Sequence, residues 1–173
     1  CKGIAGEYFK GSVIELNRLY IDDEVSQKLN NVASQFVSFG LKQLKPLNKI
    51  VVSYADSGMN HTGFIYQACN FMYTGKTKSR TDIYSGLGKH SRHYEKGKKG
   101  KYRVIRTSKY RYVYVCGDKR FKKKVMLSFN YPIIKSYPKE DDKHYNVGDT
   151  EPTLLINTSN GNVFEAHSNT INE

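Results

Sequence analysis

The feature that most constrains this fold is a strand–helix–strand pattern in its N-terminal third. SVIELNRLYI (12–21) alternates along its length, and this predicts a strand. KLNNVASQFVSFGLKQLK (28–45) repeats apolar residues at helical spacing, and Pro46 follows its end. NKIVVSYAD (48–56) is short, apolar and β-branched, as buried strands are. This order predicts a βαβ crossover, so the two strands should run parallel in one sheet.

The remaining chain extends this to an α/β (α+β) fold with a mixed, partly parallel sheet flanked by helices. The further predicted segments are an acidic turn (22–27), a helix (61–73), a strand (110–117), a short basic helix (118–129) and an edge strand (131–138). Residues 74–109 are polar, basic and Gly-rich, and we expect an irregular connection there. Residues 1–139 are expected to form one domain, and 140–173 a flexible, acidic Asn- and Ser-rich tail.

The net charge of +12 is concentrated in the middle of the chain. From Lys76 to Lys124 there are 18 Lys and Arg against three acids, and tyrosines are interspersed among them. Cations follow phosphates and aromatic rings stack on bases, so this segment favours a nucleic-acid partner over a plain solvated surface. The residues expected to hold the DNA backbone are Lys98, Lys99, Lys101, Arg103, Arg106, Lys109, Lys119, Arg120, Lys122, Lys123 and Lys124.

The cysteine count and the hydropathy pattern point to a cytoplasmic protein that does not enter a membrane. The three cysteines form no CxxC pair, which disfavours a disulfide scaffold or a zinc ribbon and fits a reducing compartment. The longest purely apolar run, Ile50 to Val52, is far shorter than the roughly 20 residues that a membrane span needs.

Polar residues that follow two predicted strands indicate a catalytic cleft. Asp56 ends a parallel strand, where open α/β sheets bind ligands, and His61 begins the next helix. Tyr66 lies on a polar and aromatic stripe of that helix, and Glu15 lies on the neighbouring strand. Each has a plainer interpretation, in which Asp56 caps a turn, His61 packs on the helix and Glu15 pairs with a basic residue. Their convergence favours a pocket lined by Glu15, Asn17, Asp56, His61, Tyr66 and Asn70.

Five segments in the same order resemble the Mom family of phage DNA-modification proteins. They are CKGIAGEYF, VIELNRLYI, VVSYADSGMNHTGFIYQACNFMYTG, SKYRYVYVCGDKRFKKKV and YPIIKSYPK, and the similarity extends from Cys1 to about Lys139. Members of this family usually carry several tens of residues before the equivalent of Cys1. The resemblance therefore implies a GNAT-like acyltransferase fold without its N-terminal strands, whose central parallel strands separate to form a cleft.

The resemblance also implies a reaction, the conversion of adenine in double-stranded DNA to N6-carbamoylmethyladenine, which protects phage DNA from host restriction. On this basis the expected catalytic residues are Glu15, Asp56, His61 and Tyr66, and the expected substrate-binding residues are Asn17, Arg18, Gln67, Asn70, Tyr73, Arg111 and Tyr112. The adenine amino group is a poor nucleophile, so it needs a base and an activated electrophile. The target adenine must also leave the duplex before its amino group can be reached.

The donor molecule is expected to be either acyl-CoA-like or derived from glycine. Between Gly11 and Gly40 there is no glycine, and three acids lie where a Gly-rich loop would bind a pyrophosphate, which argues against the usual binding of coenzyme A. An Fe(II) site of His61, Glu15 and Asp56 is an alternative that the resemblance makes plausible.

Three other functions compete with this one. An AdoMet-dependent methyltransferase would need a Gly-rich nucleotide loop and an Asn/Asp-Pro-Pro-aromatic motif, and the sequence has neither. A GNAT-type acyltransferase acting on another substrate would not need the cationic segment. A non-catalytic DNA-binding protein would explain the charge but not the polar cleft.

Overall fold

The computed structural model describes residues 3–86, 100–139 and 153–166. The chain divides into two units, and each is described by itself. Unit 1 comprises Cys1–Thr77 and Lys109–Asp142, and unit 2 comprises Lys78–Ser108 and Lys143–Glu173. This division differs from the expected boundary after residue 139, because residues from both sides of that boundary join one sheet in unit 2.

Unit 1 is built on a four-stranded mixed sheet in the order β1-β2-β6-β3, formed by β1 (Val13–Glu15), β2 (Lys49–Asp56), β6 (Lys109–Cys116) and β3 (Met72–Lys76). β1 and β2 are parallel, with Ile14 opposite Val51, so the predicted crossover is confirmed. The other pairs are antiparallel. The α/β class with a partly parallel sheet is therefore confirmed.

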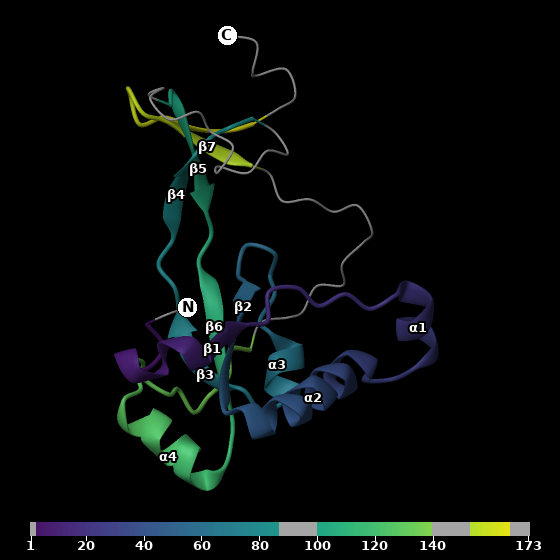
Figure 1. Cartoon of the computed structure of the whole chain (residues 1–173). Coiled ribbons are helices and arrows are strands. Elements are labelled where there is room, and N and C mark those ends of the chain that lie inside the picture. The colour runs from purple at the N-terminus through teal and green to yellow at the C-terminus, as the bar shows by residue number, and fades with distance from the viewer. Residues whose placement is uncertain (1–2, 87–99, 140–152, 167–173) are drawn as a thin grey trace. The chain divides into compact units, whose positions relative to one another are not determined.

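Two cores cover the two faces of this sheet, and helices of unit 1 lie on both sides of it (Figure 1). On one face α2 (Val32–Leu44) and α3 (Phe64–Ala68) pack against a cluster that includes Val51, Tyr73 and Tyr112. On the other face the 3-10 helix η1 (Glu7–Ser12) and α4 (Lys119–Leu127) pack against a cluster that includes Val52 and Val113. Because side chains alternate along a strand, neighbouring residues of β2 belong to different faces.

The helix predicted over 28–45 is observed as α2, which begins only at Val32, and the acidic turn predicted before it is itself a helix. Asp22 caps α1 (Asp23–Lys28) by accepting a hydrogen bond from the Glu24 N–H at 2.9 Å. Asn31, with φ of 59°, separates α1 from α2. A short 3-10 helix, η2 (Lys45–Leu47), follows α2 and contains Pro46.

The helix predicted over 61–73 covers only five residues, Phe64–Ala68. Asn70 adopts φ of 59°, and the Phe71 N–H donates to the Tyr66 carbonyl at 3.0 Å, which closes the helix. The chain then enters β3. The strand predicted over 131–138 is reduced to one bridge between Tyr73 and Ile134, in a segment where two prolines remove donors.

Unit 2 contains an antiparallel sheet in the order β4-β5-β7-β8. Its strands are β4 (Arg80–Ile83), β5 (Tyr102–Arg106), β7 (Leu154–Asn157) and β8 (Val163–Glu165). Val104, Leu155 and Ala166 form its core, and the Tyr102 and Phe164 rings meet edge to face at 5.4 Å. The irregular connection expected over 74–109 thus contains strands. So does the described part of the tail, because LLIN and VFE form a hairpin around Gly161, which has φ of 74°.

Candidate active site and cationic surfaces

The two parallel strands of unit 1 separate where the sequence analysis expected a cleft. Their pairing ends at Glu15 opposite Val52, followed by a hydrogen bond from the Leu16 N–H to the Val52 carbonyl at 2.8 Å. The Ser53 hydroxyl also donates to the Leu16 carbonyl at 2.8 Å. β2 continues to Asp56 along β6, whereas the chain after Leu16 turns toward α1. The end of β2 therefore extends beyond its pairing with β1.

One face of this end carries a group of polar side chains, which we call the polar face: Glu15, Tyr54, Asp56, Lys109 and Arg111. Lys109 Nζ lies 3.1 Å from Asp56 Oδ2, and Asp56 Oδ1 accepts from the Gly58 N–H at 3.1 Å. Burial raises the pKa of Tyr54, Arg111 acts in the opposite direction, and Glu15 raises the pKa further. These electrostatic effects require Tyr54, Arg111 and Glu15 to lie near one another.

Arg111 is the buried cation of the polar face. Its side chain is 8% exposed. Nε donates to Thr74 Oγ1 at 2.8 Å, Nη2 donates to the Thr74 carbonyl at 2.9 Å, and the guanidinium lies 3.4 Å from the centre of the Tyr131 ring. These contacts fix the guanidinium and leave a positive charge beside Tyr54.

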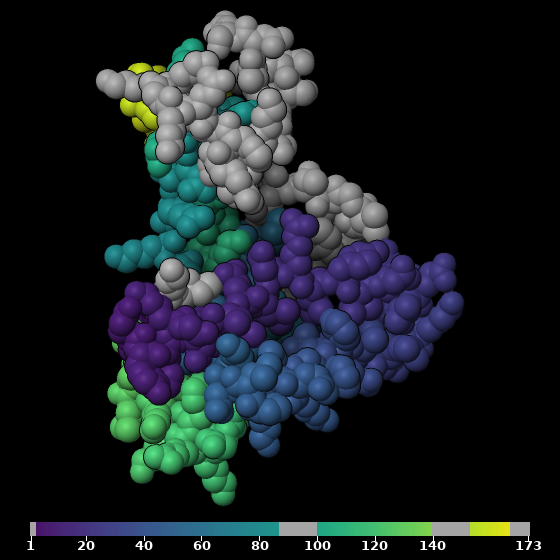
Figure 2. Space-filling model, viewed as in Figure 1, coloured from purple at the N-terminus to yellow at the C-terminus, as the bar shows by residue number. Residues whose placement is uncertain are grey.

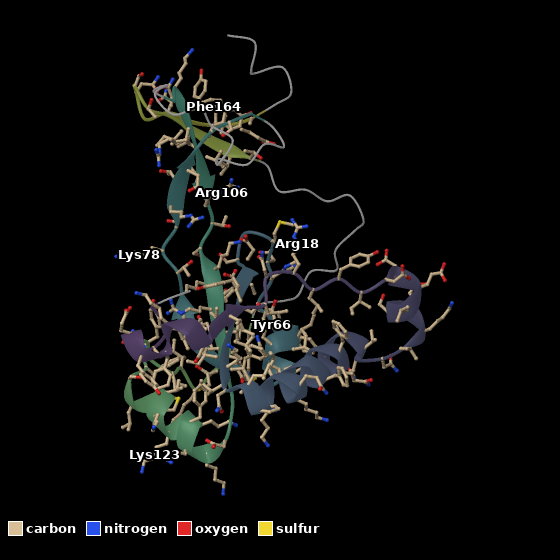
Figure 3. The ribbon with its side chains drawn as sticks, viewed as in Figure 1. Arg18, Tyr66, Lys78, Arg106, Lys123 and Phe164 are labelled. Atoms are coloured by element: carbon tan, nitrogen blue, oxygen red, sulfur yellow. The ribbon has the colours of Figure 1, made fainter. Side chains whose placement is uncertain are left out.

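Tyr66, Gln67, Tyr73 and Tyr112 belong to the opposite face of the sheet. The Tyr66 ring lies 5.4 Å from Tyr112 and 5.5 Å from Phe71, and Figure 3 shows it among the side chains of α3 and the sheet. Gln67 Nε2 donates to the Tyr112 hydroxyl at 3.2 Å, and the Tyr112 hydroxyl donates to the Thr62 carbonyl. Burial raises the pKa of Tyr112 to about 12, so its hydroxyl stays protonated at neutral pH.

The structure therefore does not bring the four expected catalytic residues into one pocket. Glu15 and Asp56 lie on the polar face, whereas Tyr66 packs behind the sheet with Tyr112. α3 packs on the side of the sheet opposite to the polar face, so its Tyr66 joins the core there. His61 is exposed, and its backbone N–H donates to the Asp56 carbonyl at 3.0 Å, in the turn that follows the end of β2.

The other expected substrate-binding residues are spread over the unit. Asn17 and Arg18 are exposed on the segment that leaves β1, and Arg18 lines an apolar groove beside α2 together with Glu15. Asn70 is exposed and lines a cavity with Cys116, at the end of β6 opposite to Lys109. Asn70 is thus remote from the polar face.

The expected iron site does not fit the side chains present. Among residues 3–86, 100–139 and 153–166, no three His, Cys, Asp or Glu side chains are grouped so that they could hold a metal ion. Asp56 is instead held by Lys109 and by the Gly58 N–H.

The expected DNA-backbone residues fall into both units. Lys119, Arg120, Lys122, Lys123 and Lys124 are all exposed on α4 of unit 1. Lys101, Arg103 and Arg106 belong to unit 2, where Arg103 donates to Thr81 and Arg106 lies 3.1 Å from Asp82. Lys98 and Lys99 lie outside the described residues. α4 is therefore the densest cationic surface in the described part of unit 1.

Three neutral residues around Arg111 were not predicted from the sequence: Tyr54, Thr74 and Tyr131. Tyr54 could have been predicted, because it lies two residues before Asp56 and therefore on the same face of the strand. Thr74 and Tyr131 become recognisable only through their contacts with Arg111.

A comparison with known protein families identifies the family of the chain. The model of the Mom protein family matches residues 2–139, which include β1, β2, β6 and α4. The chain belongs to the Mom protein family. Membership supports a role in phage DNA modification, with DNA as the substrate. A search of curated proteins finds no match to the chain. Within the described ranges, the helices of this Mom-family protein are all too short or too polar to span a membrane.

Proposed function

We propose that this Mom-family protein is a transferase that converts adenine in double-stranded DNA to N6-carbamoylmethyladenine and so protects the DNA from restriction. The observation that carries the proposal is the polar face at the point where β1 and β2 separate. It offers two carboxylates, a protonated phenol and a fixed guanidinium in a protein of a DNA-modifying family.

The chemistry requires that adenine N6 bonds to the donor carbon, that N6 loses one proton and that the donor's leaving group departs. Glu15 and Asp56 are the candidate acceptors of that proton. Asp56 is already held by Lys109 and Gly58, so its position is defined before substrate binds. Tyr54 keeps its proton because its pKa is raised, and it can donate a hydrogen bond to charge that develops on the donor.

Arg111 complements this role as a fixed positive charge. Its guanidinium is held by Thr74 and Tyr131, so it does not have to reorganise when negative charge develops nearby. The donor is an activated carbon electrophile, acyl-CoA-like or derived from glycine.

Two steps are needed to bring DNA to this site. The negatively charged backbone binds the cations of the protein, and the target adenine leaves the duplex. The cations of α4 provide backbone contacts that carry no sequence information. The adenine must be flipped out of the duplex, since N6 is inaccessible inside the stack. The half-buried Tyr54 and Tyr131 are candidate stacking partners.

The test is nucleoside mass spectrometry on plasmid DNA from cells that express the protein. We expect N6-carbamoylmethyladenine with the native chain and a loss of at least about 100-fold for Glu15→Gln or Asp56→Asn. Glu24→Gln is the matched control, because Glu24 is an exposed carboxylate in an ion pair with Lys28, and it should leave the modification unchanged. Unmodified adenine with duplex binding retained would instead support a non-catalytic DNA-binding protein.

A further inference from the structure

The cavity of unit 1 that Asn70 and Cys116 line lies at the end of the sheet remote from Asp56. Its volume is about 320 Å³, within the range of small-molecule sites. Its walls come from α2, η2, α3, the end of β6 and α4. β6 pairs with Asp56 at Lys109 and reaches this cavity at Cys116, so the cavity is separate from the polar face.

Three lysines from three elements surround this cavity, which we call the lysine pocket: Lys42 of α2, Lys45 of η2 and Lys122 of α4. None of the described residues that line it is an aspartate or a glutamate. In the described ranges, the ion pairs of the chain do not involve these three lysines. Figure 2 shows the green atoms of α4 beside the blue atoms of the C-terminal part of α2.

The floor of the lysine pocket is neutral. Cys69 and Cys116 are 5% and 1% exposed, and Leu41 and Tyr114 complete the apolar part. Burial raises the pKa of the Cys116 thiol to about 11, and the opposing effect of Lys122 is smaller. The thiol therefore adds no negative charge at neutral pH. Ser38 and Asn70 add a hydroxyl and an amide to the lining.

We propose that the lysine pocket binds a phosphate group. A concave site whose described lining offers three ammonium groups, neutral hydrogen-bonding side chains and no carboxylate matches the charge and the acceptor oxygens of phosphate. Two sources share this chemistry: the terminal phosphate of a free nucleotide, and a phosphodiester of bound DNA. The proposal stands on the cavity itself and does not depend on the adenine modification. In the competing explanation, Lys42 and Lys45 only balance the C-terminal dipole of α2.

The experiment measures the affinity of the full chain for pyrophosphate, for ADP and for a short duplex at low salt. The pocket variant is Lys42→Gln/Lys45→Gln/Lys122→Gln. The control variant is Lys10→Gln/Lys28→Gln/Lys135→Gln, which removes the same charge from exposed positions outside both the pocket and α4. Thermal melts check that both variants fold as the native chain does, since all six side chains are exposed.

Each outcome decides the proposal. A loss of at least about tenfold in pyrophosphate and ADP affinity in the pocket variant alone identifies a free phosphate compound as the ligand. A comparable loss of duplex affinity, larger than in the control variant and without nucleotide binding, identifies a DNA phosphate. If the pocket variant weakens neither ligand more than the control variant does, the proposal is wrong. None of these readouts requires modified adenine, so they are independent of the proposed reaction.

Discussion

At the scale of single residues, Arg111 shows how a buried charge is held by two neutral residues, Thr74 and Tyr131. Thr74 accepts from the guanidinium twice, once through its hydroxyl and once through its carbonyl, and Tyr131 covers the flat surface. Removal of the side chain would leave the Thr74 groups buried without this donor, since Thr74 is 1% exposed.

We therefore expect Arg111→Ala to lower the free energy of unfolding by about 3 kcal/mol, from the lost charge-assisted hydrogen bonds and the lost ring contact. The free energy of unfolding of Arg111→Lys should lie between those of the native chain and Arg111→Ala, because lysine keeps the charge but lacks the planar guanidinium. Urea unfolding measures both. Arg120→Ala, at an exposed position of α4, is the control and should change stability by less than about 0.5 kcal/mol. Equal effects of Arg111→Ala and Arg120→Ala would contradict this account of Arg111.

Cys116 provides a second prediction at this scale, through pH. Burial raises its thiol pKa from 9.0 to about 11, so the folded chain holds this proton more tightly than the unfolded chain does. Its contribution to stability is complete below about pH 9 and is lost as the pH rises toward 11. Unfolding measured from pH 8 to 10 should show this decline, and Cys116→Ala should flatten it. An unchanged decline in the variant would assign the effect to other groups, such as Tyr112.

At the scale of elements, the sequence predicted those whose local signals were complete. β2 is apolar and β-branched, β6 alternates, and α4 begins at a capping aspartate. The predictions failed where the decisive contact lies outside the element. Asn70 ends α3 by a left-handed backbone, and the β7–β8 hairpin needs β5 beside it to bury Leu155. The tail appeared polar because its apolar strands are only four and three residues long.

The candidate site follows the same division. The crossover correctly places Glu15 on the strand beside β2, whereas the association of Tyr54 with Asp56 was not predicted, although the alternation of β2 contains it. The sequence could not show that Tyr66 faces away from them, because this depends on which face of the sheet α3 covers. Helical spacing fixes which residues share a stripe, but not the surface that the stripe contacts.

The cap of α4 gives a prediction at this scale. The Asp118 side chain accepts from the Phe121 N–H at 2.6 Å, and the aspartate also carries a negative charge at the positive end of the helix. Asp118→Ala should cost about 1 kcal/mol of unfolding free energy, and Asp118→Asn, which keeps the capping oxygen, should cost less. Urea denaturation of the two variants provides the comparison. A stability of Asp118→Ala equal to that of the native chain would show that α4 is held by Phe121 and Val125 packing alone.

At the scale of the whole molecule, cations occur on both units, and the salt dependence of DNA binding measures how many contact phosphate. Each phosphate contact contributes about 0.9 to the slope of log K against log salt. If Lys119, Arg120, Lys123 and Lys124 of α4 all contact the duplex, their replacement by Gln should lower the magnitude of this slope by about 3 to 4. The corresponding change in unit 2 replaces three exposed cations, Lys78, Arg80 and Lys101, and should lower the magnitude of the slope by about 2 to 3 if all three contact the duplex.

Comparison of the α4 variant with the unit 2 variant shows whether DNA contacts unit 1 alone or contacts both units. A lower slope in both indicates that each unit contacts the backbone, whereas a lower slope in the α4 variant alone confines binding to unit 1. Lys10→Gln/Lys28→Gln is the control, because each of these lysines already pairs with a glutamate of its own helix, and it should change the slope by less than about 1. Titrations of a fluorescent duplex at four salt concentrations provide the slopes. A slope that none of these replacements alters would remove the cationic surfaces from DNA binding, and with them the route by which DNA is proposed to reach Glu15 and Asp56.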